Sequence, residues 1–92
     1  MKTEHLDAET KGLIRMVDGN IEAGTMTYSK AGKERLIIDH TDVNAAYKGK
    51  NIGRNLLMEV VNFARKNQLK IIPLCPFAKS VFDRDESIRD VL

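Results

Sequence analysis

The feature that most constrains the fold is a change in hydrophobic period near residue 52. Before that point, apolar residues follow strand spacing in three segments, residues 12–17, 21–28 and 35–43. From residue 52 onward the apolar positions lie on one face of a helix: Ile52, Leu56, Leu57, Val60, Phe63 and Ala64. Residues 69–75 return to a strand pattern. The sequence therefore predicts three strands followed by a strand–helix–strand unit.

Short turns join the first three strands. Asp18-Gly19 is typical of a hairpin, and Lys30-Ala31-Gly32 turns the chain again. Strands connected in this way pair as an antiparallel meander. The later crossover is expected to be right-handed and to make a parallel pair. Together these patterns predict an α/β fold of the α+β type with a mixed sheet.

The ends of the predicted elements carry their own signals. Residues 1–11 are polar and are predicted to form a flexible N-terminal tail, which leaves one domain over residues 12–92. Asn67 is a candidate left-handed stop for the helix. Pro73 lacks an N–H, so we expect its strand to lie at an edge or where strands splay apart. Pro76 suits the first turn of a second helix.

Composition limits the class of protein. The chain has 92 residues, 42% of them hydrophobic, and a net charge of only +2, which favours neither nucleic acid nor a membrane surface as a partner. Its apolar runs are too short to span a bilayer, and no secretory signal is visible. One cysteine permits no internal disulfide, and no cluster has metal-ligand spacing. We expect a cytoplasmic protein without a metal, either a monomer or a weak homodimer.

The loop before the helix carries the main functional signal. It reads Lys48-Gly49-Lys50-Asn51-Ile52-Gly53-Arg54. Unpaired N–H groups and the helix dipole at such a helix start favour an anion such as a diphosphate. Glycines allow close approach, and asparagine accepts left-handed backbone angles. The alternative interpretation is a flexible basic turn with exposed lysines, and the glycine spacings of Rossmann and P-loop sites are absent.

At this point the chain resembles a known family. The segment Ile-Ile-Asp-His-Thr-Asp-Val from Ile37, followed by the basic loop and Asn-Leu-Leu to Leu57, is similar to the core of the GNAT superfamily of acyl-CoA-dependent acetyltransferases. The similarity covers residues 12–92 and matches a short single-domain branch. Two positions depart from the family pattern. Lys48 stands where the superfamily prefers Gln or Arg, and Asn51 stands where it prefers Gly.

The resemblance implies a cofactor and the residues that hold it. The cofactor would be acetyl-CoA, with its pyrophosphate wrapped by the loop residues Lys48, Gly49, Lys50, Asn51, Ile52, Gly53 and Arg54. The backbone of Thr41, Asp42 and Val43 would pair with the pantetheine arm like an added strand. The family fold also splays its fourth and fifth strands, which would explain Pro73.

Two side chains are candidates for the chemistry. Cys75 precedes Pro76 at the start of a helix, an environment that stabilises a thiolate. His40 ends the neighbouring strand and is predicted to approach Cys75, as a general base for an amine or as an activator of the thiol. The bland alternatives are a small buried cysteine and a strand-end histidine bonded to a backbone carbonyl. Many relatives use a tyrosine as the acid for the leaving thiolate, and here Phe82 falls in that region.

The favoured prediction is therefore an enzyme, an N-acetyltransferase that moves acetyl from acetyl-CoA to an unidentified amine. A second hypothesis is a CoA-binding module without turnover, since the usual tyrosine acid is missing. A third is a basic interaction domain for nucleic acid or protein, which would need a wider basic face than the sequence shows.

Overall fold

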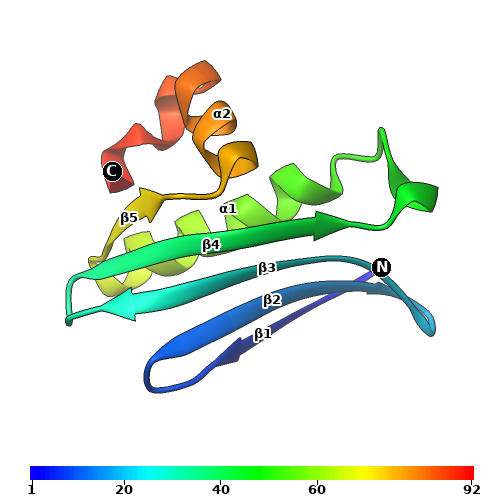
Figure 1. Cartoon of the computed structure of the whole chain (residues 1–92), viewed down its shortest axis with the longest axis horizontal. Helices are drawn as coiled ribbons and strands as arrows, with labels where there is room; N and C mark the ends of the chain where they lie inside the picture. The colour runs from blue at the N-terminus through cyan, green and yellow to red at the C-terminus, as the bar shows by residue number, and fades with distance from the viewer.

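A single five-stranded sheet forms the centre of the molecule (Figure 1). The computed structural model describes the whole chain, residues 1–92. The strands lie side by side in chain order: β1 Lys2–Asp7, β2 Lys11–Asp18, β3 Ile21–Ala31, β4 Arg35–Val43 and β5 Lys70–Pro73. The first four are antiparallel, and β5 pairs with β4 in parallel. The mixed sheet predicted from the sequence is thus confirmed.

The N-terminal residues contradict the predicted flexible tail, because Lys2–Asp7 forms strand β1 along the whole of β2. The polar sequence hides this strand, since one face and one edge of it meet solvent. His5 is the residue that turns inward, packing edge-on against Tyr28 and Phe63. The Tyr28 hydroxyl donates to Asp7 Oδ1 at 2.7 Å, so His5 Nε2 donates to that hydroxyl at 2.6 Å. These hydrogen bonds tie β1 to the sheet.

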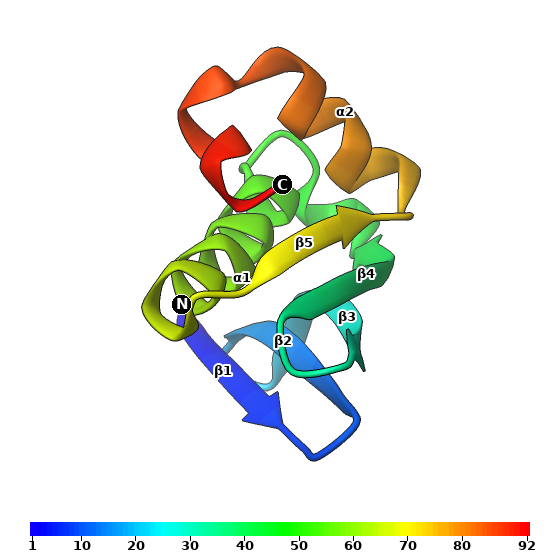
Figure 2. The ribbon, with the colours of Figure 1, turned by 90° about the vertical axis from the view of Figure 1, so that its left-hand side faces the viewer.

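The helices cover one face of the sheet. Helix α1, Ile52–Asn67, packs on β2, β3 and β4, while α2, Pro76–Arg84, lies by β4 and β5 (Figures 1 and 2). Short 3₁₀ turns, η1 Ala45–Tyr47 and η2 Glu86–Val91, precede α1 and end the chain. The left-handed residue that stops α1 is Gln68 (φ 58°), one position after the predicted Asn67. Figure 2 shows no helix on the opposite face of β1–β3.

The core lies between α1 and the covered face of the sheet. Alternate residues of β2, β3 and β4 point into it, while their neighbours point to the open face. Its largest fully buried members include Tyr28, Phe82, Ile14, Met26, Leu36 and Ile38. Ile88 and Val91 of η2 are buried as well, so the C-terminal segment packs against the same core. Strand β4 therefore has one side that faces the helices and one side that faces solvent.

Candidate active site

The first element of the site is the gap between β4 and β5. Only residues 35–38 of β4 pair with β5, and the last pair joins Ile38 to Pro73. The Cys75 N–H still donates to the Ile38 carbonyl at 3.1 Å, after which the chain turns into α2. Residues 39–43 of β4 therefore have no strand on this side. The splay predicted from Pro73 is present, and it leaves a free backbone edge of the kind that pairs with an extended ligand.

The second element is the segment from Asn44 to Asn51, which carries the chain from β4 into α1. The Asn44 side chain caps η1 by accepting from the Ala46 N–H at 3.0 Å. The Tyr47 hydroxyl donates to Asp18 Oδ2 at 2.7 Å, anchoring the segment to the β2–β3 turn. Gly49 and Asn51 both have positive φ, 81° and 60°. Asparagine thus maintains the left-handed conformation at the position where the family prefers glycine.

The N-terminus of α1 lacks a cap. Asn51 occupies the N-cap position, but its side chain makes no capping hydrogen bond. The first intrahelical bond of this turn runs from the Asn55 N–H to the Asn51 carbonyl, at 2.9 Å. The N–H groups of residues 52–54 precede it and have no helical acceptor. With the dipole of a helix of 16 residues behind them, these N–H groups are of the kind that favours an anion, and the predicted diphosphate contact there stays a prediction.

A groove of about 780 Å³ lies between the start of α1 and α2, and it reaches β4 at Val43. Seven of the predicted cofactor residues line it: Val43, Lys48, Gly49, Asn51, Ile52, Gly53 and Arg54. Thr41, Asp42 and Lys50 are not among its lining residues. Sequence reasoning did not assign five others to the site, namely Tyr47, Phe77, Val81, Arg84 and Asp85. Four of these come from α2 and the turn after it, which only the fold brings to the groove.

One of the basic side chains in the groove is already paired with a carboxylate, which the sequence does not indicate. Arg54 donates to the Asp85 carboxylate, so it is not an unpaired cation. Ser87 and Arg54 together lower the pKa of Asp85 to about 2, which keeps this carboxylate charged. Lys48 makes no ion pair, and Lys50 lies over the Tyr47 ring at 5.3 Å from its centroid. Asp85 stands two residues before Ser87, a spacing at which an aspartate often caps the start of a helical turn. This spacing could have predicted that Asp85 ends α2 and begins the next turn.

Gly53 has a packing reason to be glycine. A Cβ at this position would lie 2.6 Å from Cζ of Phe77, on α2. The first turn of α1 and the first turn of α2 therefore approach closely only because residue 53 has no side chain. The sequence predicts a glycine there for contact with a ligand, and that interpretation stays a prediction.

Cys75 lies at the junction of the gap and α2. Its side chain is 5% exposed, and the thiol donates to Thr41 Oγ1 at 3.2 Å. Burial by itself raises the pKa of the thiol. In the thiolate form, however, the Thr41 hydroxyl and the N–H groups of Ala78 and Phe77 donate to the sulfur, and these hydrogen bonds lower the pKa below its ordinary value. The thiolate is thus favoured at the start of α2, as predicted for a cysteine at a helix N-terminus.

His40 is not the partner of Cys75. Thr41 occupies that position, because consecutive residues of a strand point to opposite faces. His40 pairs in register with Thr27 and borders a second hollow, on the open face, together with Ser29 and Asp39. The predicted approach of the two side chains across the splay is therefore wrong. What the structure places together is Cys75 with Thr41 on one side of β4 and His40 on the other.

Both tyrosines are engaged elsewhere. Tyr28 is fully buried, and burial together with Asp7 raises the pKa of its hydroxyl. Tyr47 donates to Asp18, which likewise raises its pKa. Phe82, which occupies the region where relatives place a tyrosine, is a core residue with 1% of its surface exposed. No side chain at the gap is therefore an evident acid for a leaving thiolate.

Known proteins resemble this chain in fold and in sequence. A family model for GCN5-related N-acetyltransferases matches residues 14–91. The solution structure of a GCN5-like protein from Staphylococcus aureus is 38% identical, with a TM-score of 0.72; the match covers 96% of this chain and 85% of that one. Protein NATD1 of Danio rerio is 27% identical over 75 residues, 82% of this chain and 67% of that protein.

A more distant structure, from the GNAT family of Desulfovibrio desulfuricans, shows the likeness of fold alone. It is 18% identical, has a TM-score of 0.65, and is matched over 70% of this chain and 43% of that one. None of the helices described above is long and apolar enough to cross a membrane. The matched family model spans the splayed strands, the anion-binding helix start and Cys75. This chain belongs to the GCN5-related N-acetyltransferase family.

Proposed function

We propose that the protein binds acetyl-CoA in the groove and transfers its acetyl group to an amine. The observation that supports this most directly is the order of three features along α1 and β4. The groove contains the uncapped start of α1 and reaches β4 at Val43. The free edge of β4 leads from there to Thr41, which contacts Cys75; this cysteine has a lowered pKa but does not itself line the groove. An anionic head, an extended amide-bearing arm and a thioester are the matching parts of acetyl-CoA, in that order.

The residues suit these parts chemically. The N–H groups of residues 52–54, with Lys48, would hold the diphosphate, and residues 41–43 of β4 would pair with the amides of the arm. Arg54 would contribute less than a free arginine, because Asp85 already neutralises it. When bound, acetyl-CoA supplies an acetyl group activated as a thioester. The groove lining alone does not determine the acceptor.

The transfer requires two changes of bonding. The acceptor, protonated in water, first loses a proton, and its nitrogen then forms a bond to the acetyl carbonyl carbon while the carbon–sulfur bond breaks. The electron pair of that bond leaves with the CoA sulfur, which takes up the second proton of the amine. His40, an exposed imidazole on the open side of β4, is the candidate general base for removal of the first proton. In a covalent route, the Cys75 thiolate would accept the acetyl group first and pass it on to the amine.

Calorimetric titration with acetyl-CoA tests the cofactor. We expect saturable one-to-one binding that Lys48→Gln weakens. Lys66→Gln, which removes the same charge from an exposed lysine near the far end of α1, serves as the matched control. Equal affinity of both variants would refute the placement of the diphosphate. Intact mass after incubation with acetyl-CoA would show an added acetyl group only if the covalent route operates, and Cys75→Ser would then abolish it.

A CoA-binding module without turnover is the second candidate. The observation in its favour is that both tyrosines are bonded elsewhere and no acid stands at the gap. Release of CoA thiol, measured with a thiol reagent while a panel of amines is supplied, distinguishes the two. A rate no higher than that of acetyl-CoA alone, for every amine, would support the module.

A further inference from the structure

A second hollow lies on the open face of the sheet, away from the helices. It has a volume of about 650 Å³, within the range of small-molecule sites. Residues of four structural segments border it: Leu6, Lys11, Leu13, Ser29, Asp39 and His40. The groove described above shares none of these residues. This feature, called here the outer hollow, is therefore a separate concavity of the same sheet.

The outer hollow and Cys75 lie on opposite sides of the same stretch of β4. The register of β3 and β4 shifts between Thr27 and Tyr28, so that Thr27 pairs with His40 and Tyr28 pairs with Ile38. Asp39 is the extra residue of this bulge, and bulges of this kind re-aim side chains next to active sites. Immediately after it, His40 borders the hollow while Thr41 contacts Cys75 on the opposite side. The bulge lies in the part of β4 that has no partner in β5.

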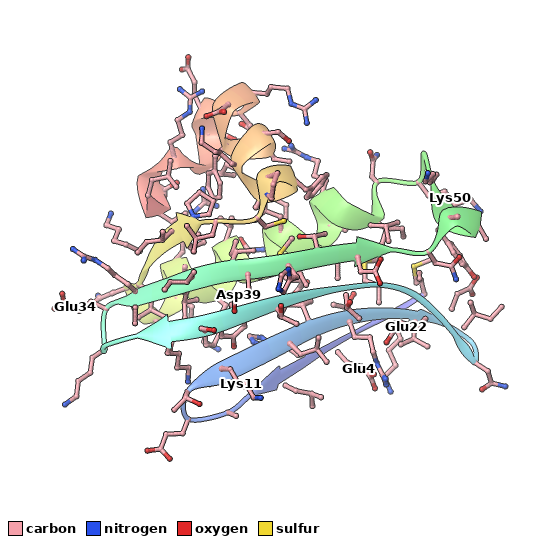
Figure 3. The ribbon with its side chains drawn as sticks, viewed as in Figure 1. Glu4, Lys11, Glu22, Glu34, Asp39 and Lys50 are labelled. Atoms are coloured by element: carbon pink, nitrogen blue, oxygen red, sulfur yellow. The ribbon has the colours of Figure 1, made fainter.

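Two opposite charges border the hollow without ion partners. Asp39 accepts a hydrogen bond from Ser29 Oγ at 2.6 Å but has no cation within ion-pair distance. Lys11 has no carboxylate within that distance either. They come from β4 and β2, two strand spacings apart, or about 10 Å between backbones. Figure 3 shows both on the open side of the sheet.

The wall of the hollow beside these charges is apolar. Leu6 on β1 is 62% exposed, and Leu13 on β2 pairs with it in register on the same face. An exposed and a half-buried leucine beside unpaired charges present a surface for a ligand that has both apolar and charged groups. On the same face, Arg15 pairs with both Glu4 and Glu22, whereas Arg35 and Asp42 of β4 have no ion partner.

We propose that the outer hollow binds the acceptor, and that the acceptor is an amino acid with an apolar side chain. Its ammonium group would lie at Asp39, its carboxylate at Lys11, and its side chain against Leu6 and Leu13. This placement sets the nitrogen beside His40 and the bulge, with the acetyl group arriving from the Cys75 side. The inference rests on the proposed acetyl transfer for its chemistry, but the binding site stands on the contacts above.

The test measures binding without requiring turnover. L-leucine is titrated into ¹⁵N-labelled protein, in parallel with 3-methylbutylamine, which lacks the carboxylate, and 4-methylpentanoate, which lacks the ammonium group. We expect saturable shifts in the amides of residues bordering the outer hollow with leucine. The dissociation constant should be higher by about tenfold for either analogue, because hydrogen bonds to charged groups contribute most.

Variants assign each charge to its partner. Asp39→Asn keeps a hydrogen-bond acceptor for Ser29. It should weaken the binding of leucine about tenfold and leave the affinity for 4-methylpentanoate unchanged. Lys11→Gln should weaken leucine while leaving 3-methylbutylamine unchanged. Glu34→Gln, in the distant β3–β4 turn (Figure 3), is the control for loss of a single charge.

The outcomes separate the two proposals. Leucine binding at the outer hollow without release of CoA thiol, for leucine and for every amine of the panel, would uphold the amino-acid site but refute the acetyl transfer and, with it, the role of that amino acid as acceptor. Thiol release with other amines, together with no leucine-induced shifts or with shifts confined to the groove, would uphold the transfer and overturn the amino-acid acceptor. Equal affinity for leucine and 3-methylbutylamine would also overturn it, because the carboxylate would then have no partner.

Discussion

Replacing Gly53 by alanine tests how the two helices shape the groove. The new Cβ would lie 2.6 Å from Cζ of Phe77, whereas ordinary contacts begin near 3.4 Å, so the ring must move by at least about 0.8 Å. Overpacking of this kind costs about 1–3 kcal/mol. Alanine recovers up to about 1 kcal/mol through its higher helix propensity. We therefore expect a loss of about 1 kcal/mol in the free energy of unfolding, measured by urea denaturation.

The same substitution should weaken binding of acetyl-CoA. Phe77 is only half-buried and lines the groove, so its ring yields more easily toward the groove than toward the core. Adding Phe77→Leu to Gly53→Ala should restore both stability and affinity, with Phe77→Leu alone as the reference. If the double variant binds as poorly as Gly53→Ala, the ring is not the obstacle and the ligand itself needs the glycine. Unchanged stability in Gly53→Ala would refute the clash.

Three further predictions follow from individual contacts. Thr41→Val removes the side-chain hydrogen-bond partner of Cys75 and should raise the pKa of its thiol. The pH profile of the alkylation rate of Cys75 should then shift to higher pH, whereas Thr41→Ser should leave the profile unchanged. Asp85 has a pKa near 2, below its ordinary 3.8, so the stability it contributes is fully present above 3.8 and lost as pH falls through about 2. Thermal unfolding should therefore show the difference between the protein and Asp85→Asn disappearing over that range. Tyr28→Phe leaves His5 without its partner and should cost about 1–3 kcal/mol, with hydrogen exchange of β1 amides rising first.

The sequence contained enough information for the order of elements from residue 12 onward. Hydrophobic period separates strand from helix because a strand alternates every second residue while a helix repeats near every third or fourth. That rule identified β2, β3, β4, α1 and β5 from local residues alone. It failed for β1, whose inward residue is His5, since an edge strand with one apolar-facing side chain carries almost no alternation.

Local chemistry also marked the anion position before α1. Glycine, asparagine and lysine at a strand-to-helix junction indicate left-handed turns and free N–H groups, and residues 49 and 51 adopt those conformations. A cysteine before a proline indicated a thiol at a helix start, and Cys75 lies there. These properties depend on neighbours a few positions apart, which is why they can be read without the fold.

Contacts between distant segments were decided only by the tertiary structure. The bulge at Asp39 sets which way the following residues point, so that Thr41 instead of His40 reaches Cys75. Packing of α2 on α1 brings Asp85 to Arg54 and thereby neutralises a cation that the sequence presents as free. The period of a strand predicts that side chains alternate between its two faces, but it does not predict where a bulge adds one residue and shifts that alternation. The Arg54–Asp85 ion pair joins residues 31 positions apart, so it depends on how the two helices pack. The sequence by itself thus determined the elements from residue 12 onward and the left-handed turn before α1, whereas strand β1, the faces of β4 and the charge of the groove required the assembled sheet and helices.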